Sequence, residues 1–172
     1  MSDQTRLSKA VASLDRVNLE TKKVIFGMAK GLRDIDVIQS FNQFSLDLFT
    51  TIIEITHKLG EKEGDVRGYK GLYDNAIKIN IKLPIEKFTL FILEYAPEIY
   101  AEDEDCFLKM PIPDKKVTVD NEFGLIRSEM FKKLWVKLDK EDKCRIKDKV
   151  VLVTMYAHAY LYQTVLHNSA KI

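Results

Sequence analysis

Histidine and cysteine are the residues of this sequence best suited to catalysis, and the chain of 172 residues contains only three His and two Cys. Cys144 stands between Lys143 and Arg145, where neighbouring positive charge would stabilise a thiolate. A nucleophilic cysteine also needs a base, and the sequence does not indicate which histidine could approach it. His158 lies in an apolar stretch rich in tyrosine, which predicts a hydrogen-bonded histidine of the core. A Cys-His hydrolase is therefore a minor alternative.

Metal and phosphate sites would need local patterns that this sequence lacks. It has no His-Glu-x-x-His or Cys-x-x-Cys pair. The four acids of residues 102–105 lack the alternating oxygen ligands, central Gly and closing Glu of a calcium-binding loop. Four of the seven glycines fall within residues 60–71, but no Gly-Lys-Ser/Thr ending follows, so an exposed Gly-rich loop is predicted there. We expect no catalytic residues, no metal and no cofactor.

Charge is distributed in two blocks of opposite sign. Residues 86–105 carry seven acidic residues against one basic residue, and residues 127–149 carry nine basic residues against five acidic ones. The acidic patch that we predict as an interaction surface consists of Glu98, Glu102, Asp103, Glu104 and Asp105. The basic patch consists of Lys132, Lys133, Lys137, Lys140, Lys143 and Lys147. Opposite patches on one chain can meet either within one molecule or between neighbouring copies.

Nucleic-acid association through the basic face of residues 132–149 is an alternative from a different functional class. Against it, Asp139, Glu141, Asp142 and Asp148 are interleaved with the lysines, and the nearby aromatic residues are needed for the core rather than for stacking on bases. The whole chain has a formal net charge of only +1. Other proteins are therefore the favoured partners.

The element that must position the basic patch is a long helix predicted over residues 138–166. Asp139 is its expected N-cap, with Glu141 and Asp142 in the first turn, where the helix dipole favours negative charge. One face repeats at helical spacing and consists of Ile146, Val150, Val153, Ala157 and Tyr160. The second half is apolar on every side, so we expect residues 150–162 to be the most buried segment, wrapped by other helices.

A second regular helix is predicted between Asp34 or Asp36 and Gly60. Its face is a heptad repeat formed by Ile38, Phe41, Ser45, Leu48, Ile52, Ile55 and Leu59. A coiled-coil dimer is one interpretation, but the apolar face is wide and the run of heptads is short, which favours packing inside a helical domain.

The remaining segments complete an all-α prediction. Residues 1–33 form two short helices that either pack on the core or stand away as a peripheral arm, and packing is favoured. Residues 77–83 alternate like a strand but also fit a helix that stops before Pro84, and helix is preferred because no clear partner strand exists. Further helices are expected after Pro84 and over residues 123–138. The expected fold is one all-α domain, residues 1–172, with about six to eight helices around a buried C-terminal helix.

The second half of the chain, from about Leu72 to Leu161, carries a recognisable series of motifs. They are, in order, Ile85 and Phe88 after Pro84, then Pro97, an acidic run ending in Phe107 and Leu108, Leu134 with Trp135, and Lys143 with Ile146 before an apolar helix. In these motifs the chain resembles a family of small uncharacterised proteins of nucleocytoplasmic large DNA viruses. It departs from the family pattern at Cys106 and Lys147, where the family has aromatic residues.

The resemblance implies an all-helical viral protein of the virion or its assembly pathway, and it carries over no catalytic residue. Two cysteines are too few for a disulfide framework, so a reducing compartment, the host cytoplasm or the virion, is expected. Residues 150–170 lack formal charge, but polar residues interrupt them too often for a membrane span. Together these features predict a non-enzymatic structural or assembly protein that binds other proteins, either itself or virion components.

Overall fold

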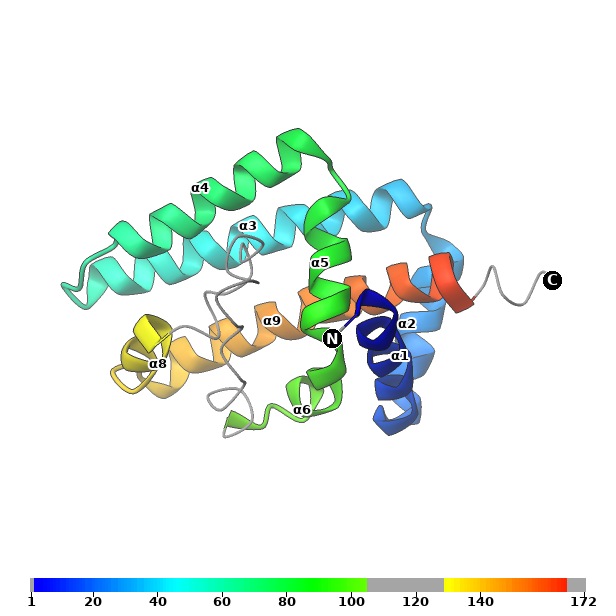
Figure 1. The fold of residues 1–172 in the computed structure, drawn as a ribbon. Coiled ribbons are helices and arrows are strands. Elements are labelled where there is room, and N and C mark those ends of the chain that lie inside the picture. Colours follow the sequence, from blue (N-terminus) through cyan, green and yellow to red (C-terminus); the bar gives the residue numbers. More distant parts are fainter. Residues whose placement is uncertain (1, 105–128, 167–172) are drawn as a thin grey trace.

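The computed structural model describes residues 2–104 and 129–166, and every regular element within these residues is helical. The eight α-helices of Figure 1 are α1 (Asp3–Ser13), α2 (Leu19–Gly31), α3 (Asp34–Lys58), α4 (Gly64–Ile79), α5 (Leu83–Phe91), α6 (Ala96–Tyr100), α8 (Glu129–Trp135) and α9 (Lys140–Leu161). Two short 3₁₀ turns, η1 (Leu14–Arg16) and η2 (Leu93–Tyr95), and a π-helical turn (Tyr162–Leu166) join or extend them. The prediction of one all-α domain is confirmed for the described residues.

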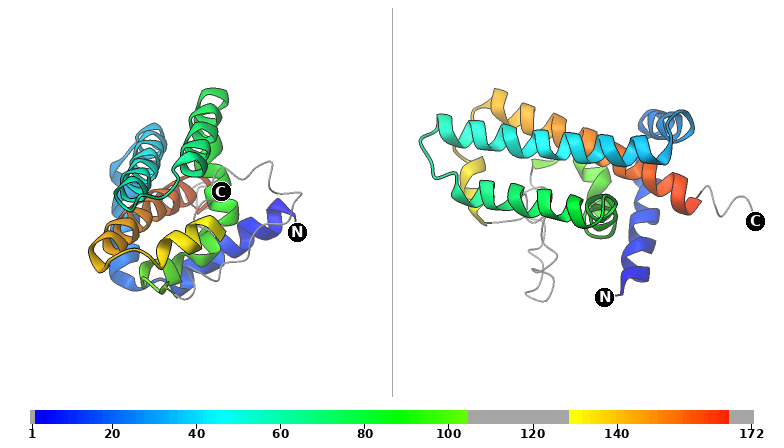
Figure 2. Two further views of the ribbon diagram at one scale, coloured as in Figure 1. Left: turned by 90° about the vertical axis from the view of Figure 1, so that its left-hand side faces the viewer. Right: turned by 90° about the horizontal axis from the view of Figure 1, so that it is seen from above.

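The two longest helices, α3 and α9, lie side by side and form the centre of the molecule (Figures 1 and 2). The predicted heptad face of α3 points into this centre, because Phe41 and Ile52 are fully buried and Ile38 and Ile55 are 1% exposed. The heptad repeat therefore packs inside the molecule, as preferred over the coiled-coil dimer.

Helix α9 begins as its sequence predicts and is buried unevenly. The Asp139 side chain accepts a hydrogen bond from the backbone N–H of Asp142 at 2.8 Å, which satisfies one of the unpaired donors of the first turn. Seven of the residues from Val153 to Leu161 are buried. The expectation that residues 150–162 are enclosed on every side is wrong in one respect, since Leu152, Met155 and Tyr156 remain half-buried.

The N-terminal helices pack on the core instead of forming an arm. Asn18 caps α2 by accepting a hydrogen bond from the N–H of Thr21 at 2.8 Å. Ala10 of α1 and Ile25 of α2 have no exposed surface. Helix α2 contacts α9, and α1 contacts α5 and η2, so both N-terminal helices pack on the same core.

Residues 60–71 are not the exposed Gly-rich loop that we predicted. The loop is short, and α4 begins at Gly64, so Gly64, Gly68 and Gly71 are helical. Glycine lowers helix propensity, but Val66, Tyr73 and Ala76 bury one side of α4 against α3 and α5, and this tertiary packing outweighs the local preference. The same helix continues to Ile79, which confirms helix over strand for the start of residues 77–83.

The chain then turns through α5, η2 and α6 before the acidic patch. Pro84 occupies the first turn of α5, where its missing N–H costs nothing. Helix α6 ends at Tyr100, and Glu102 in the turn after it adopts the left-handed conformation at φ +55°. The backbone N–H of Asp103 donates a hydrogen bond to the carbonyl of Glu98 at 2.9 Å. The helix predicted over residues 123–138 is described only as α8, and its first part, with Phe123, lies outside the described residues.

Candidate functional site

The acidic and basic patches meet within one molecule at Glu104. This carboxylate accepts a hydrogen bond from the indole N–H of Trp135 at 2.6 Å and pairs with Lys143 at 3.1 Å and Lys147 at 3.7 Å. The ammonium groups of both lysines also lie 5.6 and 5.9 Å from the centre of the Trp135 ring. Hydrogen bonds from Trp135 and Lys143 lower the pKa of Glu104. Glu104 thus ties the end of the acidic segment to α8 and α9.

The other acidic residues have different environments. Glu98 pairs with Arg16 at 3.0 Å, and Arg16 also donates to the backbone carbonyl of Glu94 at 3.3 Å, so this acid fastens α6 to the N-terminal region. Glu102 and Asp103 are exposed in the turn after α6. Asp105 lies outside the described residues. The four described acids of the patch therefore do not form one free surface.

The basic patch is likewise divided. Lys143 and Lys147 point toward Glu104, whereas Lys137 forms an ion pair with Glu61 in the turn after α3. Lys133 and Lys140 are exposed and have no ion-pair partner among residues 2–104 and 129–166. The sixth member, Lys132, is half-buried. The lysines that remain at the surface flank the turn between α8 and α9.

This turn also exposes a large apolar side chain. Val136, directly after α8, is 73% exposed, while its neighbours Trp135 and Leu138 are 0% and 7% exposed. We define the basic corner as Lys133, Val136, Lys137 and Lys140. It stands at one end of the molecule, where α8 meets the start of α9 (Figure 1).

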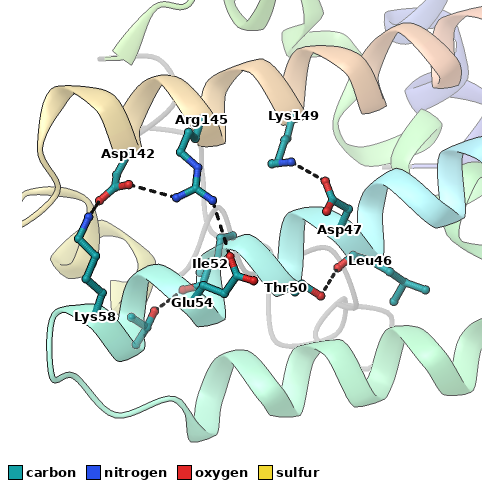
Figure 3. A network of polar contacts seen from close by, with 10 residues as sticks. Leu46, Asp47, Thr50, Ile52, Glu54, Lys58, Asp142, Arg145 and Lys149 are labelled. Atoms are coloured by element: carbon teal, nitrogen blue, oxygen red, sulfur yellow. Dashed lines mark hydrogen bonds and ion pairs between the residues drawn. The ribbon is translucent and has the colours of Figure 1, made fainter.

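Behind the basic corner, ion pairs hold α9 against α3 (Figure 3). They join Asp142 with Lys58, Arg145 with Glu54, and Lys149 with Asp47. Asp142 is only 3% exposed and accepts hydrogen bonds from Lys58 at 2.9 Å and from Arg145 at 3.4 Å. The hydrogen bond from Lys58 lowers the pKa of Asp142, and the same contact raises the pKa of Lys58. Helix α9, which carries Lys140, Lys143 and Lys147 of the basic patch, is therefore fixed in position.

His158 is a core histidine, as predicted from its apolar surroundings. It has no exposed surface, and its Nδ1 lies 2.6 Å from the Tyr100 hydroxyl. Burial lowers the pKa of His158 to about 4 and raises the pKa of Tyr100, so both groups are neutral near pH 7. The neutral Tyr100 hydroxyl can donate to Nδ1 of His158 or accept from it, according to which ring nitrogen carries the proton. The Nε2 atom of His158 is buried without a hydrogen-bond partner among the described residues.

Those residues considered for catalysis that the structure describes do not converge. Cys144 is exposed near the start of α9, and His158 follows it by fourteen residues, about 21 Å along a helix. His57 is exposed and lies 2.8 Å from Glu63. His167 lies outside the described residues. Within residues 2–104 and 129–166, no three His, Cys, Asp or Glu side chains are grouped as metal ligands.

Comparison with known proteins places the chain in a viral family. No family model matches it, and no solved structure is significantly similar. Uncharacterized protein R465 of Acanthamoeba polyphaga mimivirus is 58% identical over 168 residues, which cover 97% of this chain and 93% of the mimivirus protein. The chain belongs to the family of that mimivirus protein. The similarity supports the viral origin that the resemblance implied, over nearly the whole length instead of the second half alone.

In this member of the family, several interaction partners in the site have no signal in the sequence. Arg16, Glu61 and Tyr100 are bound to patch or core residues that lie between 58 and 82 positions away. The sequence predicts that Trp135 points into the core, but it gives no signal for the hydrogen bond from the indole N–H to Glu104. The sequence also gives no signal for an open cavity of about 230 Å³ between α1, α5 and α9, which is lined by Leu7, Glu86 and Tyr160 among others.

No described helix is both long enough and apolar enough to cross a membrane.

Proposed function

We propose that this protein is a non-enzymatic structural or assembly protein of a large DNA virus and that the basic corner contacts another virion protein. The observation that carries the proposal is the exposure of Val136 at 73%, surrounded in the corner by Lys133, Lys137 and Lys140. An apolar centre with a polar and charged rim is the arrangement of residues found in protein–protein contacts. The expected partner surface is acidic around an apolar pocket that receives Val136.

The lysines of the corner would orient the partner and speed its arrival. Lys143 and Lys147 are engaged by Glu104, whereas Lys133 and Lys140 extend to solvent without a partner among the described residues. Exposed ion pairs each contribute little affinity, so the apolar contact would supply most of the binding free energy. Raising the salt concentration should therefore slow association more than it accelerates dissociation.

A protein partner is favoured over nucleic acid by the state of the aromatic residue nearest to the corner. Trp135 is completely buried and bonded to Glu104, so its ring is not available for stacking on a base. Asp139 and Glu141, both exposed, place negative charge beside the lysines. The first feature removes stacking on bases, and the second weakens the attraction to a phosphate backbone.

The test uses virus particles in which the natural chain is replaced by variants. Mass spectrometry of purified particles should find the protein at a constant stoichiometry, and Val136→Asp combined with Lys133→Glu should reduce its incorporation several-fold. The matched control is Lys23→Glu with Lys30→Glu, which changes two exposed lysines of α2. Absence of the protein from particles would overturn the virion role. Equal incorporation of both variants would overturn the role of the basic corner, and tight DNA binding lost in the first variant alone would favour nucleic acid.

A further inference from the structure

The open cavity of about 230 Å³ lies between α1, α5 and the C-terminal end of α9, whose arrangement can be followed in Figure 1. Its walls are mainly apolar and include Leu7 of α1, Leu90 of α5 and Leu161 of α9. A single water molecule needs only about 10–15 Å³ of such space, so the cavity can admit a chain of several carbon atoms. Water in an apolar cavity has few polar partners, and an apolar chain displaces it readily.

The hydroxyl groups of the cavity wall donate to protein oxygens. The Tyr160 hydroxyl donates to a carboxylate oxygen of Glu86 at 3.3 Å. The Thr89 hydroxyl donates to the carbonyl of Ile85 at 2.8 Å, and the Thr164 hydroxyl donates to the carbonyl of Tyr160 at 2.9 Å. The wall therefore offers a ligand the carboxylate of Glu86, which is an acceptor, rather than a donor.

The charge of Glu86 is not paired with a basic side chain among residues 2–104 and 129–166. Glu94, on the next turn of the chain, pairs with Lys9 at 3.9 Å. The lysine that follows Glu86 in sequence, Lys87, lies instead 5.9 Å from the centre of the Phe91 ring. Glu86 is thus an acid beside an apolar cavity whose polar contact is with an uncharged tyrosine.

Negative charge acts on this end of the cavity from two helices. Burial, followed by the negative charges of Glu86 on α5 and Asp34 on α3, raises the pKa of Tyr160 to about 12. Tyr160 is therefore neutral near pH 7 and remains the donor to Glu86. The same two carboxylates would attract a cationic ligand and repel an anionic one.

We propose that this cavity binds an alkylammonium group, with the carbon chain against Leu7, Leu90 and Leu161 and the ammonium beside Glu86. A free amine and a lysine side chain of another protein both present this group. Glu86 is exposed, so its ion pair adds little affinity, and the enclosed carbon chain supplies most of it. The cavity lies at the end of α9 opposite to the basic corner, so the proposal goes beyond the proposed function and does not depend on it.

An NMR titration of the isotope-labelled full chain with n-hexylammonium, at pH 7 and low salt, tests the site. The amide shifts should be concentrated around Leu90, Tyr160 and Thr164, with a dissociation constant on the order of 1 mM. Ethylammonium, which lacks the carbon chain, and hexanoate, which has the opposite charge, should bind much more weakly. Equal binding of hexanoate and n-hexylammonium would overturn the proposal, and so would the absence of localised shifts up to about 20 mM.

Two variants separate the charge of the site from its shape. Glu86→Gln should raise the dissociation constant of n-hexylammonium about two- to fivefold, because the ion pair is exposed. Leu90→Trp should abolish binding, because the larger side chain fills the cavity, and unchanged amide shifts elsewhere will verify that the variant is folded.

The matched controls are Glu20→Gln, at an exposed acid of α2, and Leu72→Trp, at a leucine of α4 that is 53% exposed. Both should bind n-hexylammonium as the natural chain does. Binding that Glu20→Gln weakens as much as Glu86→Gln does would overturn the role of Glu86. Unchanged binding in folded Leu90→Trp would overturn the cavity as the site.

The source of the alkylammonium group is identified by comparing n-butylammonium with a tripeptide that has a central lysine and blocked ends. Both carry the same carbon chain and cation. Tighter binding of the peptide supports the site and assigns it to a lysine of a protein partner, because the peptide backbone then fits at its mouth. Tighter binding of n-butylammonium supports the site and assigns it to a free amine. Peptide shifts that are unchanged in Leu90→Trp would overturn the assignment to a lysine side chain in the cavity.

Discussion

Helices α9 and α4 both pack against α3, but they are stabilised in different ways. Helix α9 is also in contact with α2, α5 and α6, and three ion pairs join it to α3 (Figure 3). Among the described residues, helix α4 has only α3 and α5 as substantial neighbours, and three of its sixteen residues are glycines. Its buried side is nevertheless apolar and complete, with Val66 and Tyr73 having no exposed surface.

The comparison shows that one well-packed side is sufficient for a helix whose own sequence is unfavourable. Tertiary packing of an apolar face supplies most helix stability in proteins, so glycines on the opposite side are tolerated. In α9 nearly every side has a structural task, whereas in α4 the outward side has none within the described residues. Substitutions should therefore have large effects in α9 and small or opposite effects on the outward face of α4.

The largest difference is expected for a buried charge. Val153 of α9 is 2% exposed, and Val153→Asp should unfold the domain, because an unpaired charge in an apolar site costs at least several kcal/mol against a total stability of about 5–15 kcal/mol. Asn75→Asp on the outward face of α4 should change the free energy of unfolding by less than about 0.5 kcal/mol. Urea denaturation followed by circular dichroism measures both. Similar midpoints for the two variants would contradict the comparison.

The second difference concerns pH, because α9 encloses a titratable group. The pKa of His158 is about 4 in the folded protein, against an ordinary value of 6.5. The unfolded chain therefore binds the proton more tightly than the folded protein does. The contribution of neutral His158 to the free energy of unfolding is complete above pH 6.5. It decreases by up to about 3 kcal/mol as the pH falls toward 4. The carboxylates with lowered pKa, Asp142 and Glu104, lose their contribution only in a lower range, from about 4.5 downward.

His158→Gln is the variant that isolates this effect. Glutamine can accept the Tyr100 hydrogen bond but does not titrate. Its free energy of unfolding should be nearly flat between pH 7 and pH 5, where the natural protein becomes less stable. Equal pH dependence in the two proteins would show that another group is responsible.

The third difference compares two aspartates that form ion pairs. Asp142→Ala in α9 should cost about 1–3 kcal/mol, because it removes hydrogen bonds to Lys58 and Arg145 from a carboxylate that is 3% exposed. Asp74→Ala in α4 breaks a pair with Lys70 at 3.7 Å on the helix surface, which is worth only about 0.3–0.5 kcal/mol. Thermal unfolding at pH 7 in low salt measures both variants. A larger effect for Asp74→Ala would contradict the interpretation of Figure 3.

The smallest expected effect is an increase in the free energy of unfolding, whereas the two preceding variants decrease it. Gly68→Ala on the outward face of α4 should stabilise the monomer by about 0.5–1 kcal/mol, because alanine favours the helix and fits without contact. Urea denaturation followed by circular dichroism measures the change in the free energy of unfolding. Ala157→Gly in α9 should destabilise instead, since Ala157 is fully buried. Loss of stability in Gly68→Ala would indicate that α4 needs glycine for an internal reason.

The sequence alone determined the features that depend on neighbouring residues. The caps of α2 and α9 at Asn18 and Asp139, the buried heptad face of α3 and the role of Pro84 in α5 follow from side-chain chemistry and helical spacing within a few residues. The core character of His158 followed in the same way from its apolar surroundings. These local signals were sufficient for the all-α fold class.

Only the tertiary structure decided what depends on residues far apart in the chain. Glycine-rich residues 60–71 predict a loop locally, but the chain is helical from Gly64 because Val66 and Tyr73 find apolar partners on α3 and α5. Likewise, charge counting could not decide whether the opposite patches meet within one molecule or between copies. The answer for Glu104 is within one molecule, because the fold brings Trp135 and Lys143 to it across 31 and 39 residues of sequence. Such contacts gain their free energy only after the chain has closed the intervening loop, so no local pattern encodes them.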